Sequence, residues 1–315
     1  MTRYLKLSAV AVAALAAGPA WAEFPNDDNI TFVIPYGPGG GFDTIVRTYA
    51  PALEEALGAT VVPENIPGAS GTRGGQAVYR ANPDGYTIGI FNIPGLTVSE
   101  ATERDIGFPL GEITWIANLA EEQYAIAVKT DSPIQSVADL CATGQPIKLS
   151  DTGVDSTSSI TAVISFDILD CPIVNVTGYG GSNDTMIAVM RGEVDATLKP
   201  IGSLAKYVES GDLRYIFTLT DSTAIEGVES AADIGHPELA KFTINRVVGG
   251  PPNMPADVVT ALSDALKVAT ESAPVQEWAS GTGTSLSYLP ADATTAKMGD
   301  LSTFYAQYKG LLAPK

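Results

Sequence analysis

The sequence predicts an α/β fold, because stretches typical of strands and stretches typical of helices alternate along most of the chain. The alternation forms two blocks, roughly residues 29–120 and 124–240, in which several strands end in a glycine-rich or polar turn before a helix, as in parallel sheets. Amphipathic helical stretches at 255–270, 274–280 and 291–312 then close the chain. We therefore expect two parallel-sheet units with a helical tail.

The first block contains a helix from Asp43 whose apolar residues recur at helical spacing and which Gly58 is placed to end. The other elements expected in this block are a strand at 30–35, a glycine-rich turn at 36–42, a strand at 59–65, a helix around 76–80 and a strand within 82–92.

The second block begins with a short apolar strand and a helix that Ser136 is expected to cap. We expect its strands at 124–129, 146–151, 172–179, 193–200 and 214–220, its helices at 136–142, 160–169, 183–191 and 201–214, and an extended segment at 242–252.

The N-terminus has the three parts of a secretory signal peptide. Arg3 and Lys6 form a basic start, residues 7–17 are apolar, and Ala20-Trp21-Ala22 fits a cleavage site. We expect cleavage after Ala22 and export; an N-terminal membrane anchor is the alternative.

Charge and composition narrow the function classes. The chain has 18 basic and 36 acidic residues, a net charge of −18, and removal of the signal with its two basic residues would leave −20. Nucleic acid and direct membrane insertion are therefore not expected. One histidine and two cysteines leave little for metal or nucleophile chemistry, so we expect a binding protein, a monomer without metal or cofactor, rather than an enzyme.

Cys141 and Cys171 are candidates for one disulfide if the chain is exported to an oxidising compartment. The bridge would close a loop of about 30 residues and contribute roughly 3–4 kcal/mol on the chain-entropy account. Two buried thiols are the alternative.

The glycine loop at 36–43 is the most distinctive local feature. It lies between a strand and a helix, where backbone N–H groups can approach an anion and the helix dipole favours negative charge. It lacks the ending of a Walker A loop and the third glycine of a dinucleotide fingerprint. An ordinary tight turn is the alternative. We expect its glycines to permit close approach or an unusual φ, and the candidate ligand-binding residues are Tyr36, Gly39, Gly40, Gly41, Phe42 and Asp43.

Three more strand ends add candidates. The loop at 151–159 again precedes a helix, although its hydroxyls could equally be ordinary helix caps. The turn at 178–181 brings an aromatic ring to a third strand end. The candidates from these loops and from the strand within 82–92 are Asn92, Thr152, Gly153, Ser156, Thr157, Tyr179 and Gly180.

His236 lies in a polar stretch, DIGHPEL, that is typical of a surface turn. A secreted hydrolase would depend on this one histidine or on an acidic pair, because the chain has no second histidine and no G-x-S-x-G elbow. A secreted hydrolase is therefore the alternative to a binding protein.

The ordered combination of these loops resembles the substrate-binding proteins of tripartite tricarboxylate transporters, the Bug family. The family's Pro-aromatic-x-x-Gly-Gly-x-x-Asp stretch is matched at 35–43, its Val-x-Asn-x-x-Gly-Ala-x-Gly segment closely at 62–71 and its Pro-Asp-Gly-Tyr-Thr at 83–87. Its later Pro-Tyr-x-Gly appears here as Gly178-Tyr179-Gly180-Gly181. The resemblance spans nearly all of the chain after the expected signal.

The resemblance implies a two-lobed periplasmic binding protein (type II-like) with a ligand cleft between two α/β domains. Domain one would comprise 23–122 and 243–315, domain two 123–242, and the chain would cross between them twice. The protein would capture a small carboxylate, held largely by backbone N–H groups and water, and deliver it to membrane transporter subunits. A ligand-binding subunit of a sensory system has the same fold and is a further alternative.

The sequence departs from the family in two places. Family members commonly have a His shortly after the Gly-Ser loop of domain two, whereas the corresponding residues here, 156–159, are Ser and Thr. The Lys often found in the family's Pro-Tyr-Lys-Gly stretch is replaced by Gly180. Lys199 and Arg246 are basic residues near positions where the family lines its cleft, and they are the last two candidate ligand-binding residues. The alternative for both is an exposed charge that only keeps the protein in solution. The departures leave open which carboxylate is bound.

Overall fold

The computed structural model describes residues 24–26 and 28–312. The expected signal peptide, 1–22, lies outside the described residues. In the part of the chain that is described, no helix combines the length and apolar character needed to cross a membrane.

The main sheet has the strand order β10-β4-β9-β3-β1-β2, and β7 and β8 also pair with β4. β1 pairs in parallel with β2 and β3, whereas β9 lies antiparallel between β3 and β4. A second, two-stranded parallel sheet consists of β5 and β6. The strand bounds are β1 Ile30–Ile34, β2 Val61–Asn65, β3 Thr87–Ile93, β4 Thr114–Lys129, β5 Ile147–Ser150, β6 Ile173–Val176, β7 Thr197–Pro200, β8 Leu213–Thr218, β9 Thr243–Gly250 and β10 Leu286–Leu289.

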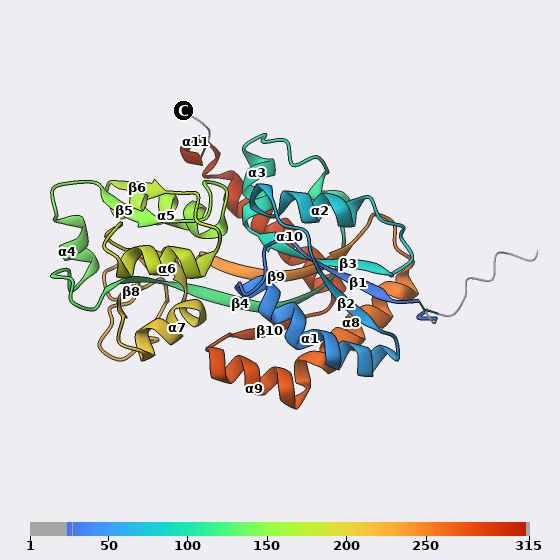
Figure 1. Ribbon diagram of the computed structural model, residues 1–315. Coiled ribbons are helices and arrows are strands. Elements are labelled where there is room, and N and C mark those ends of the chain that lie inside the picture. Colours follow the sequence, from blue (N-terminus) through green and yellow to red (C-terminus); the bar gives the residue numbers. More distant parts are fainter. Residues whose placement is uncertain (1–23, 27, 313–315) are drawn as a thin grey trace, which may run out of the picture.

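The long strand β4 connects the two halves of the molecule. Its first part pairs with β9 and β10, and its last part pairs with β7 and β8. Figure 1 shows β4 and β9 running between a group that contains β5, β6 and α4–α7 and the remaining elements. Residues far apart in the sequence are thus joined by one continuous sheet.

The helices pack on the sheets and on one another. α1 packs against α8 and β2, and α10 packs against β4 and α3. The helix bounds are α1 Gly41–Leu57, α2 Thr72–Tyr79, α3 Gly95–Ala101, α4 Val137–Cys141, α5 Thr157–Ile168, α6 Ser182–Met190, α7 Ile201–Glu209, α8 Ala256–Glu271, α9 Ala273–Thr282, α10 Ala291–Ala306 and α11 Lys309–Leu312.

Helix α1 forms as its sequence pattern predicts. Ile45, Val46, Tyr49 and Leu53 recur on one face and are buried against the core. Full burial of one such aliphatic side chain stabilises the fold by about 1.5–3 kcal/mol. The helix ends where Gly58 adopts a left-handed conformation with φ 70°, which glycine adopts without steric cost.

The sequence-based expectation of two parallel-sheet blocks is wrong for much of the main sheet. β9 pairs antiparallel with β3 and β4, and β7 and β8 pair antiparallel with β4. The strand expected at 124–129 begins ten residues earlier, at Thr114. That part escapes periodicity analysis because the polar residues Asn118 and Glu122 are buried within it. The structure also adds α3 and β10 and divides the helix expected at 291–312 into α10 and α11.

A disulfide joins Cys141, at the end of α4, to Cys171, which follows α5. Ser136 caps α4 as expected and forms a capping box with Asp139: each side chain accepts a hydrogen bond from the other residue's backbone N–H. The bridge therefore ties a short helix to the end of a longer one.

Thiol titration of the protein purified without reductant and then denatured should detect no thiol, and reduction should release two. Replacing both cysteines, in Cys141→Ser/Cys171→Ser, should lower the free energy of unfolding by about 3–4 kcal/mol, because the bridge restricts the unfolded chain. Urea unfolding of both proteins measures this loss, and equal stability would contradict the structural role of the bridge.

Candidate functional site

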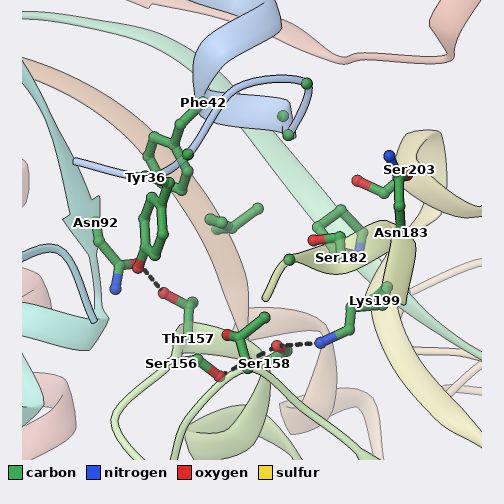
Figure 2. Close-up of a pocket in the computed structure, with 18 of the residues that line it drawn as sticks. Tyr36, Phe42, Asn92, Ser156, Thr157, Ser158, Ser182, Asn183, Lys199 and Ser203 are labelled. Atoms are coloured by element: carbon green, nitrogen blue, oxygen red, sulfur yellow. Dashed lines mark hydrogen bonds between the residues drawn. The ribbon is translucent and has the colours of Figure 1, made fainter. Parts of the chain in front are cut away.

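A cavity of about 230 Å³ opens where the N-termini of α1, α5 and α6 approach one another. In Figure 2, Tyr36 and Phe42 form one wall, Lys199, Asn183 and Ser203 lie on the opposite side, and residues at the start of α5 lie between them. The cavity is lined by 36–42, Asn92, Tyr124, Thr152, 156–158, 180–184, Lys199, Pro200, Ser203, Ile244 and Arg246.

Most of the residues predicted to bind a ligand come together in this cavity. Those that line it are Tyr36, Gly39, Gly40, Gly41, Phe42, Asn92, Thr152, Ser156, Thr157, Gly180, Lys199 and Arg246. Asp43, Gly153 and Tyr179 do not line it. Tyr179 packs instead against the cluster of buried residues between α6, α7 and β8. Contact with a ligand stays a prediction for each residue.

Within the glycine loop, the conformational requirement falls on Gly39 rather than Gly40. Gly39 has φ +80°, whereas Gly40 has φ −86° and ψ 171°, an extended conformation that any residue adopts. Gly41 is restricted by space, since a Cβ there would lie 2.9 Å from Nη2 of Arg246. The expectation of an unusual φ at Gly40 is therefore wrong, and close approach is the reason that remains for glycine at this position.

Asp43 fixes the position of the glycine loop through hydrogen bonds made outside the cavity. Its buried carboxylate accepts hydrogen bonds from Gly39 N–H at 2.9 Å, from Asn65 Nδ2 at 2.9 Å and from Arg47 Nε at 2.8 Å. Burial raises the pKa of this carboxyl, but the hydrogen bonds from Gly39, Asn65 and Arg47 outweigh burial and hold the pKa below its ordinary value. Asp43 thus positions the loop and is not itself part of the cavity wall.

Tyr36 and Phe42 form an aromatic wall. Their ring centroids lie 5.0 Å apart, and the Tyr36 hydroxyl donates a hydrogen bond to the Ser70 carbonyl at 2.9 Å. Burial raises the pKa of Tyr36, so the hydroxyl remains neutral at physiological pH. The Arg246 guanidinium lies 4.3 Å from the Phe42 centroid, in a cation–π arrangement.

Arg246 forms a buried ion pair with Glu122. Nε and Nη2 of the arginine on β9 each lie 2.8 Å from Oε1 of the glutamate on β4, and both side chains are at most 6% exposed. The alternative of an exposed solubilising charge is therefore wrong for Arg246. Glu122 escaped the sequence analysis because an acidic residue inside a strand gives no signal of its partner.

Lys199 forms the second buried ion pair, with Asp151. Its Nζ lies 3.1 Å from Asp151 Oδ2 and donates a hydrogen bond to Ser158 Oγ at 2.8 Å, and its side chain is 2% exposed. Asp151 also accepts hydrogen bonds from Thr152 N–H at 2.7 Å and from the Ser156 hydroxyl. The exposed-charge alternative is wrong here too, and the loop at 151–159 is organised around this carboxylate.

Contacts between the two halves of the molecule cross the cavity floor. The Thr157 hydroxyl at the start of α5 donates to Oδ1 of Asn92 at the end of β3, and Asn92 Nδ2 donates to the Ser70 carbonyl at 3.1 Å. Nearby, Arg104 pairs with Asp155. Asn92 and Thr157 therefore join the glycine-loop side to the α5 side.

Several lining residues were absent from the sequence-based candidates. Tyr124 and Ile244 lie on strands and have the pattern of core residues, so periodicity alone conceals them. The first turn of α6 follows the Gly180-Gly181 turn directly, and that turn was a usable signal for the residues there. The missed polar residues are Ser158, Ser182, Asn183, Asp184 and Ser203.

His236 does not line the cavity. It immediately precedes a short 3₁₀ helix at Pro237–Lys241, and its Nδ1 lies 3.0 Å from Glu238 Oε1. Its side chain is 36% exposed, in agreement with the expected surface turn. Among the described residues no group of three or more His, Cys, Asp or Glu side chains could hold a metal ion.

Residues 45–299 match the profile of a family described as the tripartite tricarboxylate transporter family receptor. The chain belongs to this family. The receptor family is a class of solute-binding proteins, and the match confirms the resemblance inferred from the loop motifs.

Individual relatives agree with this assignment. The receptor is similar to protein BugT of Bordetella pertussis, with 25% identity over 76% of each chain. Among solved structures it resembles an R. palustris protein with adipate (TM-score 0.82, 21% identity, 92% of this chain and 98% of that chain). It also resembles MatC of Rhodopseudomonas palustris with bound malate (TM-score 0.81, 19% identity, 92% and 100%). These structures confirm the expected α/β fold of a periplasmic binding protein.

Asp43→Asn should destabilise the receptor by about 1–3 kcal/mol at neutral pH, because a buried charge-assisted hydrogen-bond network is lost. Since the Asp43 pKa is lowered in the folded state, its contribution is fully present above the unfolded value and is lost as pH falls through the folded value. Urea unfolding between pH 7 and pH 3 should show the difference from wild type shrinking below about pH 4. A constant difference across that range would contradict this role.

Gly40→Val should weaken carboxylate binding by about two to four orders of magnitude. The valine side chain would keep the ligand from approaching the loop backbone closely, and two charge-assisted hydrogen bonds would be lost. A Cβ at Gly40 meets only Gly37 O, at 3.9 Å, so the fold should tolerate the change. Gly111→Val is a matched control, because Gly111 is exposed, has open space and lies outside the cavity. Calorimetric titration after a circular-dichroism check measures both, and unchanged affinity in folded Gly40→Val would refute the site.

Proposed function

We propose that this receptor captures a small carboxylate outside the cytoplasm and delivers it to the membrane subunits of a tripartite tricarboxylate-type transporter. The observation that carries the proposal is the convergence of the N-terminal turns of α1, α5 and α6 on one cavity. Backbone N–H groups and the positive end of the dipole make such termini suited to an anion. The relatives solved with malate and with adipate support a carboxylate as that anion.

The ion pairs favour recognition by dipoles, hydroxyls and water over a direct salt bridge. Lys199 and Arg246 each already have a carboxylate partner within 3.1 Å. A ligand carboxylate would therefore find N–H groups of the glycine loop and hydroxyls at the start of α5 as its principal donors. This accounts for anion binding by so acidic a protein.

We propose a division into one domain of residues 23–122 and 243–315 and a second of 123–242, with hinges in β4 and β9. Closing of the domains around the ligand is then the mechanism, without chemical conversion. The Asn92–Thr157 hydrogen bond and the Arg104–Asp155 ion pair are contacts that such a motion would make and break. We further propose a periplasmic monomer, cleaved after Ala22.

The hydrolase alternative has less support, because His236 is paired with Glu238 outside the cavity. A subunit that loads ligand onto a sensor would bind in the same way, and it differs only in its membrane partner. Loss of carboxylate uptake after deletion of the gene, with signalling intact, would distinguish the transport role.

Thermal-shift screening against mono-, di- and tricarboxylates and their amides should give a ligand that raises Tm, since binding to the folded state alone stabilises it. NMR of that ligand after overnight incubation should show no conversion. His236→Ala should change its affinity by less than about threefold, a few tenths of a kcal/mol. No binding by any carboxylate would contradict the receptor role, and turnover that His236→Ala abolishes would establish the hydrolase instead.

A further inference from the structure

The positive charges of the cavity wall are already neutralised from within the protein. Arg246 is paired with Glu122, and Lys199 is paired with Asp151. All four side chains are at most 6% exposed, so these pairs are screened little by salt. A ligand therefore meets two neutral pairs rather than two available cations.

The three helix N-termini each have a carboxylate of the protein nearby. Asp43 lies in the first turn of α1 and accepts from Gly39 N–H, and Asp151 accepts from Thr152 N–H and Ser156 ahead of α5. Asp184 lies in the first turn of α6. Each N-terminus is equivalent to roughly half a positive charge. Arg47 pairs with Asp43 and Lys199 pairs with Asp151, so the carboxylates near the N-termini of α1 and α5 each have a cation of the protein beside them, whereas Asp184 at α6 has none among the ion pairs of the described residues.

Asp184 differs from the other three carboxylates. It lines the cavity directly, and it takes part in none of the ion pairs within the described part of the chain. Its Oδ2 lies 2.9 Å from the position that a Cβ of Gly180 would occupy, so its negative charge lies against the cavity wall. The same wall carries neutral hydrogen-bonding groups on Ser182, Asn183 and Ser203.

Lys206 is a further cation on this side. It lines an adjoining hollow between α6, α7 and α9, where its Nζ lies 3.2 Å from Asn183 Oδ1 and 4.9 Å from the Tyr207 ring centroid. The side chains of Lys206 and Asp184 are both exposed, so water and salt screen both charges. Lys206 does not line the inner cavity and does not replace a cation there.

We propose that the site accepts a ligand with a single carboxylate and a neutral polar second end, and that Asp184 excludes a second carboxylate. The ligand's one anionic group would lie against the glycine loop and the start of α5, and its neutral end against Ser182, Asn183 and Ser203. This inference rests on the proposed receptor function and narrows its ligand class to monocarboxylates.

The test compares three ligands that share one carbon skeleton: adipate, its monoamide and its diamide, with the succinate series as a shorter set. Calorimetry at neutral pH and low ionic strength should show the monoamide binding at least about tenfold more tightly than the dicarboxylate, because the second charge meets Asp184 without a cation. Added salt should bring the ratio of monoamide affinity to dicarboxylate affinity closer to one. The diamide should bind at least about tenfold more weakly than the monoamide, because it lacks the anionic group.

Asp184→Asn tests the residue itself. It should raise dicarboxylate affinity at least about fivefold more than it raises monoamide affinity, because the monoamide has no second charge near residue 184. Asp257→Asn is the matched control, since Asp257 is exposed in the first turn of α8 and does not line the cavity. It should change neither affinity.

The outcomes separate this inference from the function on which it rests. Tighter binding of a dicarboxylate than of its monoamide would overturn the proposal that the site accepts only one carboxylate. The receptor role would be unaffected. An unchanged ratio in Asp184→Asn would overturn the role of Asp184. Equal binding of monoamide and diamide would overturn carboxylate recognition and this inference with it.

Discussion

Two buried ion pairs fix the charged walls of the cavity. Arg246 on β9 is held by Glu122 on β4, and Lys199 on β7 is held by Asp151 at the end of β5. Removing one partner of such a pair leaves an uncompensated buried charge and is strongly destabilising. Because Arg246 also packs over Phe42 and against Gly41, the first ion pair fixes the start of α1, and the second organises the loop before α5. The cavity exists because these four charges are satisfied.

The continuous strand β4 makes that arrangement possible. It contributes Glu122 to the first ion pair and pairs with β7, which carries Lys199 of the second. Residues from distant parts of the sequence thus meet around one long strand of 16 residues. The glycine loop adds what the ion pairs do not supply, a backbone that a small anion can approach closely.

Local patterns in the sequence predicted the glycine loop, the end of α1 at Gly58 and the capping of α4, because these depend on neighbours in the chain. The clustering of most candidate residues was predicted from their positions at strand ends and from the family resemblance. They did not predict the antiparallel pairings of β4 or the partners of Lys199 and Arg246, because these depend on residues more than 40 positions apart. Asp43 illustrates the difference. Its place after the loop was recognised, but its hydrogen bonds to Gly39 and Asn65 make it a support for the loop rather than a lining residue.

The central claim is that backbone N–H groups at converging helix N-termini recognise a carboxylate. The most direct measurement is an NMR titration that follows backbone amide signals as the ligand from the screen is added. The account predicts the largest shifts at Gly40, Gly41 and Thr157, with little change near His236. Saturable shifts confined to residues outside the cavity, with the glycine-loop signals unmoved, would contradict it.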